Sequence, residues 1–103
     1  MIKIFVLLVV LNAMIFASST TLKQQYEKNK TELKLSYDKA YKVMEKIHYN
    51  GDKFKLLHDT WYTYENQNCH FLEKLLKEDD TYIKCMNKAL KVRIQKYKEW
   101  VDF

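Results

Sequence analysis

Proline is absent from this chain of 103 residues, and glycine occurs only once, at Gly51. The turns of β-sandwiches and barrels rely on these two residue types, so their scarcity argues against a turn-rich β fold. It also argues against a glycine-rich loop that cradles a nucleotide phosphate. Aromatic residues make up 15% of the chain, which argues against a disordered tail. The length permits one small domain.

The N-terminal residues have the order of a secretory signal peptide. One positive charge at Lys3 precedes an apolar run, residues 4–16, and then the small residues 17–19. That run is too short to span a bilayer, which needs about 20 residues, although an uncleaved membrane anchor is the competing interpretation. We expect residues 1–17 to be the signal peptide, with cleavage after residue 19 as the alternative. No cysteine follows the run, which argues against a lipoprotein.

Export would place the mature domain, residues 20–103, in the periplasm or outside the cell. Two cysteines in a small domain more often pair than stay free in an oxidising compartment. A Cys69–Cys85 disulfide would close a loop with 15 residues between its ends, which stabilises by roughly 3 kcal/mol in the chain-entropy model. Two unpaired buried thiols are the alternative. Without Lys3 the chain carries 17 basic and 13 acidic side chains, a net charge of +4.

Apolar side chains recur at helical spacing and predict three helices without an intervening low-complexity linker. Thr20 or Thr21 is suited to cap the first of them. The apolar stripes are Leu22, Tyr26, Leu33, Tyr37, Ala40 or Tyr41, Met44 and Ile47 on the first helix, Phe54, Leu57, Trp61, Tyr64, Phe71, Leu72 and Leu75 or Leu76 on the second, and Tyr82, Met86, Ala89 or Leu90, Arg93, Tyr97 and Trp100 on the third. The sequence therefore predicts an all-α fold, a small three-helix antiparallel bundle with one disulfide.

Two turns are expected between these helices. Asn50-Gly51 is typical of a left-handed helix stop, and Asp52 of the cap that follows it. For the second turn, cysteines that are bridged across an antiparallel helix pair lie at similar distances from the tip. The turn is therefore predicted at residues 76–78, with Asp79 or Asp80 capping the third helix.

The cysteines belong to a spaced pattern. Trp61 is followed three residues later by the aromatic Tyr64 and five further on by Cys69, and an arginine, Arg93, lies eight residues after Cys85. This pattern resembles the exported LprI-type family, which is named for a lysozyme inhibitor. The resemblance spans roughly residues 33–95.

Upstream, residues 38–44 read Asp-Lys-Ala-Tyr-Lys-Val-Met, which is similar to the family's Asn-x-x-Tyr-Lys-x-x-Met segment, with Tyr41 at its tyrosine. The resemblance implies an inhibitor of lysozyme-type muramidases that acts by protein–protein binding in the bacterial envelope. The expected epitope is the helix-hairpin tip, where the nearby disulfide would limit the cost of ordering. It comprises Leu76, Lys77, Glu78, Asp79 and Asp80.

A second function class stays open, a non-inhibitory envelope module that binds an anionic component or another exported protein. Lysines at steps of four, three and seven form a stripe on the third predicted helix, for which a solvated face is the simpler interpretation. These are Lys84, Lys88, Lys91 and Lys98. Export argues against a nucleic-acid partner. Dimerisation through residual apolar surface at Trp61, Trp100 and Phe103 also stays open.

The remaining candidates favour structural roles. Trp61, Tyr64 and Cys69 are expected to face the partner helix as a packed core beside the disulfide. Arg93 is expected to stack on Trp61 or Tyr64 and to pair with a carboxylate such as Glu65, with an anion site as the alternative.

Metal binding and catalysis find little support in the sequence. His48, His58 and His70 would make a weak metal site at best, and the neighbours Cys69 and His70 diverge by about 100° on a helix. Because no catalytic motif is recognisable, we expect neither an enzyme nor a cofactor.

Overall fold

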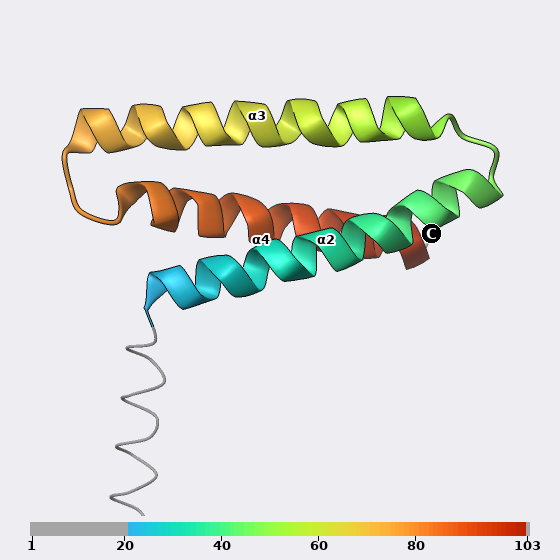
Figure 1. The fold of residues 1–103 in the computed structure, drawn as a ribbon, viewed down its shortest axis with the longest axis horizontal. Coiled ribbons are helices and arrows are strands. Elements are labelled where there is room, and N and C mark those ends of the chain that lie inside the picture. Colours follow the sequence, from blue (N-terminus) through green and yellow to red (C-terminus); the bar gives the residue numbers. More distant parts are fainter. Residues whose placement is uncertain (1–20, 103) are drawn as a thin grey trace, which may run out of the picture.

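The computed structural model describes residues 21–102, which form three helices (Figure 1). These are α2 (Leu22–Lys46), α3 (Gly51–Leu76) and α4 (Thr81–Asp102). Helix α3 runs antiparallel to both others, so α2 and α4 are parallel. The predicted all-α three-helix fold with one disulfide is confirmed. The expected signal peptide and Phe103 lie outside the described residues, and none of the helices described is long and apolar enough to cross a membrane.

Helix α4 provides most of the core because it packs against both other helices, whereas α2 and α3 contact each other less. Its Met86 and Leu90 are completely buried and its Tyr97 almost so. Leu90, Ile94 and Tyr97 of α4 form one buried cluster with Leu33 and Ala40 of α2 and Phe54 of α3, and further aromatic rings pack around it. The third predicted stripe is therefore confirmed in its central residues.

Buried polar residues also lie between α2 and α4. Asn29 donates a hydrogen bond from Nδ2 to Oδ1 of Asn87 (3.1 Å), and Asn87 Nδ2 donates to the carbonyl oxygen of Leu22 (3.2 Å). Ser36 is buried on the same face of α2. The apolar pattern missed these residues because it counts polar side chains as exposed, although positions 29, 33, 36 and 40 share one side of a helix.

The first turn corrects the expected capping. Thr21 does cap α2, since its side chain accepts a hydrogen bond from the Gln24 N–H. The left-handed residue is His48 (φ 60°), however, and not Asn50-Gly51. Asn50 is itself the cap of α3, because its side chain accepts from two backbone N–H groups, so Asp52 is not the cap. Gly51 begins α3, and a Cβ atom there would collide with the Tyr41 ring.

The second turn lies slightly later than predicted. Helix α3 ends at Leu76, and the turn comprises residues 77–80, with left-handed backbone at Lys77 (φ 53°) and Asp80 (φ 65°). Asp80, the residue before α4, therefore lacks the extended backbone typical of a capping residue. The prediction that Asp79 or Asp80 caps this helix is wrong, since neither side chain accepts a described hydrogen bond from its first N–H groups. Instead, the Thr81 hydroxyl donates to the Glu78 carbonyl oxygen (2.9 Å). Leu76 and the four turn residues, 77–80, are together called the tip below.

The inward face of α3 differs most from expectation. Phe54 and Cys69 are buried, and Trp61 and Leu72 are half-buried. Several apolar residues that were expected to face inward are instead at least half exposed, namely Leu57, Tyr64, Phe71, Leu75 and Leu76. Ile47 at the end of α2 is also exposed. Helix α3 carries more apolar side chains than α2 and α4 cover.

Candidate functional site

Arg93 lies in an aromatic cage near the middle of α4. Only 9% of the residue is exposed, and its guanidinium carbon lies 4.9 Å from the ring centroid of Trp61. Tyr97 and Trp100 lie at 5.4 and 5.7 Å from the same carbon. The expected stacking on Trp61 is confirmed, whereas Tyr64 is exposed and takes no part. The electron-rich ring faces stabilise the cation in this position.

The expected ion pair between Arg93 and Glu65 is not formed. Within residues 21–102 the ion pairs are Lys30–Glu27 and His70–Glu73, so no described carboxylate neutralises the guanidinium. Its Nε atom is buried without a hydrogen-bond partner. The faces of the three aromatic rings are therefore the main described partners of this charge.

Next to the cage, His58 and Tyr97 form a polar pair across the α3–α4 interface. Nδ1 of His58 lies 2.5 Å from the Tyr97 hydroxyl oxygen, and the imidazole ring packs against Tyr37 with 4.4 Å between centroids. Burial lowers the pKa of His58, and the nearby Arg93 charge lowers it further, while Asp59 opposes both. Burial also raises the pKa of Tyr97. Both side chains are therefore held in their neutral forms near pH 7.

A groove opens between α2 and α3 where the two helices separate. Its cavity volume is about 440 Å³, and His58 and Tyr37 contribute to its wall. The full lining is Lys30, Leu33, Lys34, Tyr37, His58, Asp59, Tyr62 and Thr63. His58, Asp59 and Thr63 share this lining, but the hydrogen bond described for His58 goes to Tyr97 and not to either of them.

The other two histidines lie elsewhere. His48 occupies the exposed turn between α2 and α3, and His70 stacks on Tyr82 near the tip (4.2 Å between centroids). Among the described residues, no three metal-ligating side chains come together. The structure therefore does not gather the three histidines into one site.

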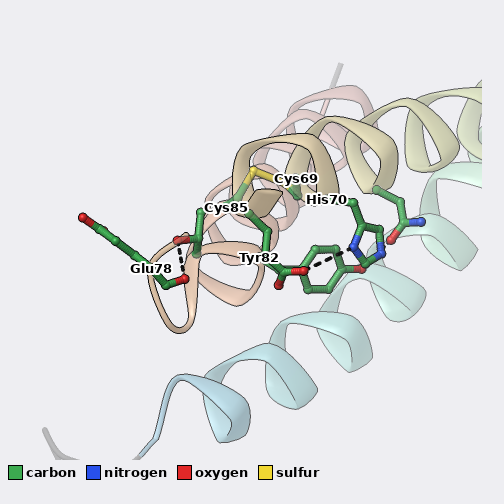
Figure 2. A network of polar contacts seen from close by, with 8 residues as sticks. Cys69, His70, Glu78, Tyr82 and Cys85 are labelled. Atoms are coloured by element: carbon green, nitrogen blue, oxygen red, sulfur yellow. Dashed lines mark hydrogen bonds and ion pairs between the residues drawn. A yellow bond between two sulfur atoms is a disulfide. The ribbon is translucent and has the colours of Figure 1, made fainter. Parts of the chain in front are cut away.

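The disulfide joins α3 to α4 just behind the tip (Figure 2). Its cysteines, Cys69 and Cys85, have Cα atoms 5.5 Å apart. The Tyr82 hydroxyl donates to Oδ1 of Asn66, and His70 covers the tyrosine ring. Glu78 points away from the helices in Figure 2. A covalent bond and a hydrogen bond thus hold the base of the tip.

Every residue of the tip is exposed, as the proposed epitope requires. Leu76 is 53% exposed, and the neighbouring Leu75 is 63% exposed. Three carboxylates follow within a few residues, those of Glu78, Asp79 and Asp80. The tip therefore combines apolar surface with negative charge at one end of the molecule.

The lysine stripe lies on the solvent face of α4. All four of its side chains, Lys84, Lys88, Lys91 and Lys98, are exposed. Among the ion pairs of residues 21–102, none includes a lysine of this stripe.

Tyr41 of α2 is half-buried and packs against Phe54 (6.2 Å between centroids) beside the first turn, which indicates a structural role.

Comparisons with known proteins give no match. The chain matches no protein-family profile, curated protein or solved structure that was compared with it. The sequence does not reveal the His58–Tyr97 pair, because the two residues are 39 positions apart and the pattern offers His58 only as a weak metal ligand.

Proposed function

We propose that this chain is an exported binding protein that inhibits a lysozyme-type muramidase by occupying its substrate cleft with the tip. The observation that carries this proposal is the combination of exposed Leu75 and Leu76 with three carboxylates at an end of the molecule that a disulfide braces. The resemblance of the Trp61-to-Arg93 pattern to the LprI-type family supports the same function.

The physical argument rests on shape and preorganisation. Two helices and a four-residue turn make a narrow projection that suits insertion into a cleft. Because the disulfide and the Tyr82–Asn66 hydrogen bond hold the base of the tip, little conformational freedom is lost there on binding. Apolar side chains surrounded by polar ones are typical of an interface core with its rim.

The charges of this chain have two opposite effects on binding to a basic enzyme. The three tip carboxylates complement a basic enzyme surface at short range, whereas the net charge of +4 on residues 18–103 repels a basic enzyme at long range. Moderate salt screens the long-range term over about 10 Å. We therefore expect association with a basic lysozyme to depend only weakly on salt.

The test is a cell-wall lysis assay in which oxidised residues 18–103 are titrated into lysozymes of several types, at low and moderate salt. We expect stoichiometric inhibition by the wild-type protein, and loss of inhibition in a double variant of the tip, Glu78→Lys with Asp80→Lys. The matched control is Asp38→Lys with Glu45→Lys, which makes the same charge change on exposed positions of α2. Absence of inhibition by the wild type, or equal inhibition by the tip variant and the control, would overturn the proposal.

The lysine stripe supports a second candidate, binding to an anionic component of the envelope. Four exposed lysines without a described ion-pair partner present a continuous positive face. Binding to vesicles that contain phosphatidylglycerol should then fall steeply with salt and be absent with phosphatidylcholine alone. The variant Lys84→Glu, Lys88→Glu, Lys91→Glu should lose it, whereas Lys28→Glu, Lys42→Glu, Lys46→Glu on α2 should bind better than that variant. Equal binding by both variants would show that the lysine stripe is not the binding surface.

A further inference from the structure

Four large apolar side chains follow one side of α3 and lie in solvent. Leu57, Tyr64, Phe71 and Leu75, called the α3 stripe below, are 50%, 64%, 62% and 63% exposed. Their spacings of seven, seven and four residues keep them on one face of the helix. Single exposed apolar residues are ordinary, but four in line on one helix are typical of an interaction surface.

The two ends of the α3 stripe carry net charges of opposite sign. Lysines outnumber acidic residues over positions 52–55, whereas acidic residues outnumber lysines over positions 73–80. Lys53 is exposed and lies four residues before Leu57, hence on the same face of the helix. Beyond Leu75, at the other end of the same helix, are the exposed carboxylates of the tip. A second copy placed antiparallel would bring the lysine of each copy to the acidic end of the other, while a parallel copy would place like charges together.

We propose that the α3 stripe binds the α3 stripe of a second copy of this chain in an antiparallel, two-fold symmetric dimer. A two-fold axis near residue 66 places Leu57 of each copy opposite Leu75 of the other. The same axis places Lys53 of each copy near the tip of the other, where Asp79 lies in the turn that follows α3. The charge pattern therefore favours a second copy in the antiparallel orientation. The register rests on these two pairs, because the same axis places Tyr64 opposite Asn68 and Phe71 opposite Trp61.

The expected dimer is weak. The α3 stripe runs over 19 residues, and the 18 steps between its ends correspond to about 27 Å of helix at 1.5 Å per residue. One helix-to-helix contact of this length falls at the low end of specific interfaces, and the net positive charge of each copy opposes association. Dimerisation is therefore expected at concentrations of about 10 µM to 1 mM and not in the nanomolar range.

This inference goes beyond the proposed inhibition and does not rest on it. The two share the tip carboxylates, so an enzyme and a second copy would compete for them. Lys53 and the middle of the α3 stripe lie outside the proposed epitope, and substitutions there test the dimer alone. A monomeric wild-type protein that still inhibits would reject the dimer and leave the proposed function standing.

Sedimentation velocity of oxidised residues 18–103 over that concentration range tests the proposal. We expect the wild type to shift from monomer to dimer, and Phe71→Glu to stay monomeric. The matched control is Leu35→Glu, which places the same charge on a comparably exposed leucine of α2 (57% exposed) and should dimerise as the wild type does. A wild type that is monomeric throughout, or equal behaviour of both variants, would overturn the proposal.

A charge exchange tests the antiparallel register. Lys53→Glu and Asp79→Lys should each raise the dissociation constant severalfold, because each places like charges together across the axis. The double variant Lys53→Glu with Asp79→Lys restores opposite charges and should return close to the wild-type constant. Additive weakening in the double variant would reject this register. Circular dichroism of each variant verifies that the helices are retained.

Discussion

At the first end of α3, Phe54 packs against Tyr97 and Trp100 of α4, with ring centroids 5.9 and 6.3 Å apart. At the other end of the same helix, Cys69 is the only completely buried residue, and its disulfide to Cys85 replaces such packing. The two ends of one helix pair are therefore held together by different means, dispersion and burial at one and a covalent bond at the other.

This difference shows how a domain of this size completes its interior. The aromatic end has three helices around it, because Tyr37 and Tyr41 of α2 also contact Phe54. Toward the tip, α3 carries exposed Phe71 and Leu75, so apolar burial contributes little there. A disulfide suits such a region because it stabilises without requiring a larger core.

The largest expected loss of stability comes from a substitution at the aromatic end of α3. Phe54→Ala should lower the free energy of unfolding by about 3–5 kcal/mol, because it removes a buried ring that touches both α2 and α4. Phe71→Ala removes the same atoms from an exposed site and should change stability by less than about 0.5 kcal/mol. Urea denaturation at low micromolar concentration measures both. Similar losses in the two variants would contradict the burial difference.

The next largest loss of stability is expected when the disulfide at the other end of α3 is removed. Cys69→Ala with Cys85→Ala should lower the free energy of unfolding by about 3 kcal/mol, as expected for a loop of this length. Hydrogen exchange sharpens the comparison, since amides near the tip should lose protection while those around Phe54 lose much less. Uniform loss along α3 would show instead that the two ends unfold as one unit.

The smallest expected effect is on the pH dependence of stability, through the protonation of His58 at the aromatic end. Because burial lowers the pKa of His58 in the folded protein, the unfolded chain binds a proton more readily. The stabilisation from neutral His58 is present above its ordinary pKa and is lost as pH falls toward the lowered value.

His58→Phe should therefore flatten the decline in stability between pH 7 and pH 5, measured by urea denaturation across that range. The control His48→Gln changes an exposed histidine and should retain the wild-type slope. An unchanged slope in the His58 variant would contradict the buried neutral imidazole.

The sequence was sufficient for the helices and the disulfide, because each follows from local spacing or from chain connectivity, whereas it left Trp61 and Tyr64 open as the aromatic partner of Arg93. It was insufficient for the orientation of α3. Periodicity identifies apolar stripes but does not say how many of them two neighbouring helices can cover, and Tyr64 and Phe71 were assigned to the core for this reason.

Polar residues in the interior were the other omission. Asn29 and Asn87 share a hydrogen bond, and His58 is paired with Tyr97. These partners offset the free-energy cost of burying each polar side chain. Such pairs link residues far apart in the chain, and only the packing of the helices brings them together. The missing carboxylate beside Arg93 has the same origin, since three aromatic rings took the place that was expected for Glu65.

The parallel course of α2 and α4 has a practical consequence for anything attached ahead of Thr21. The beginning of α2 lies at the same end of the molecule as the tip (Figure 1), because Tyr26 contacts Tyr82 and the Leu22 carbonyl oxygen accepts a hydrogen bond from Asn87. A fusion partner or affinity tag joined there would stand beside the acidic residues and shield them from a large ligand. A tag joined after α4 would lie at the far end and leave them accessible.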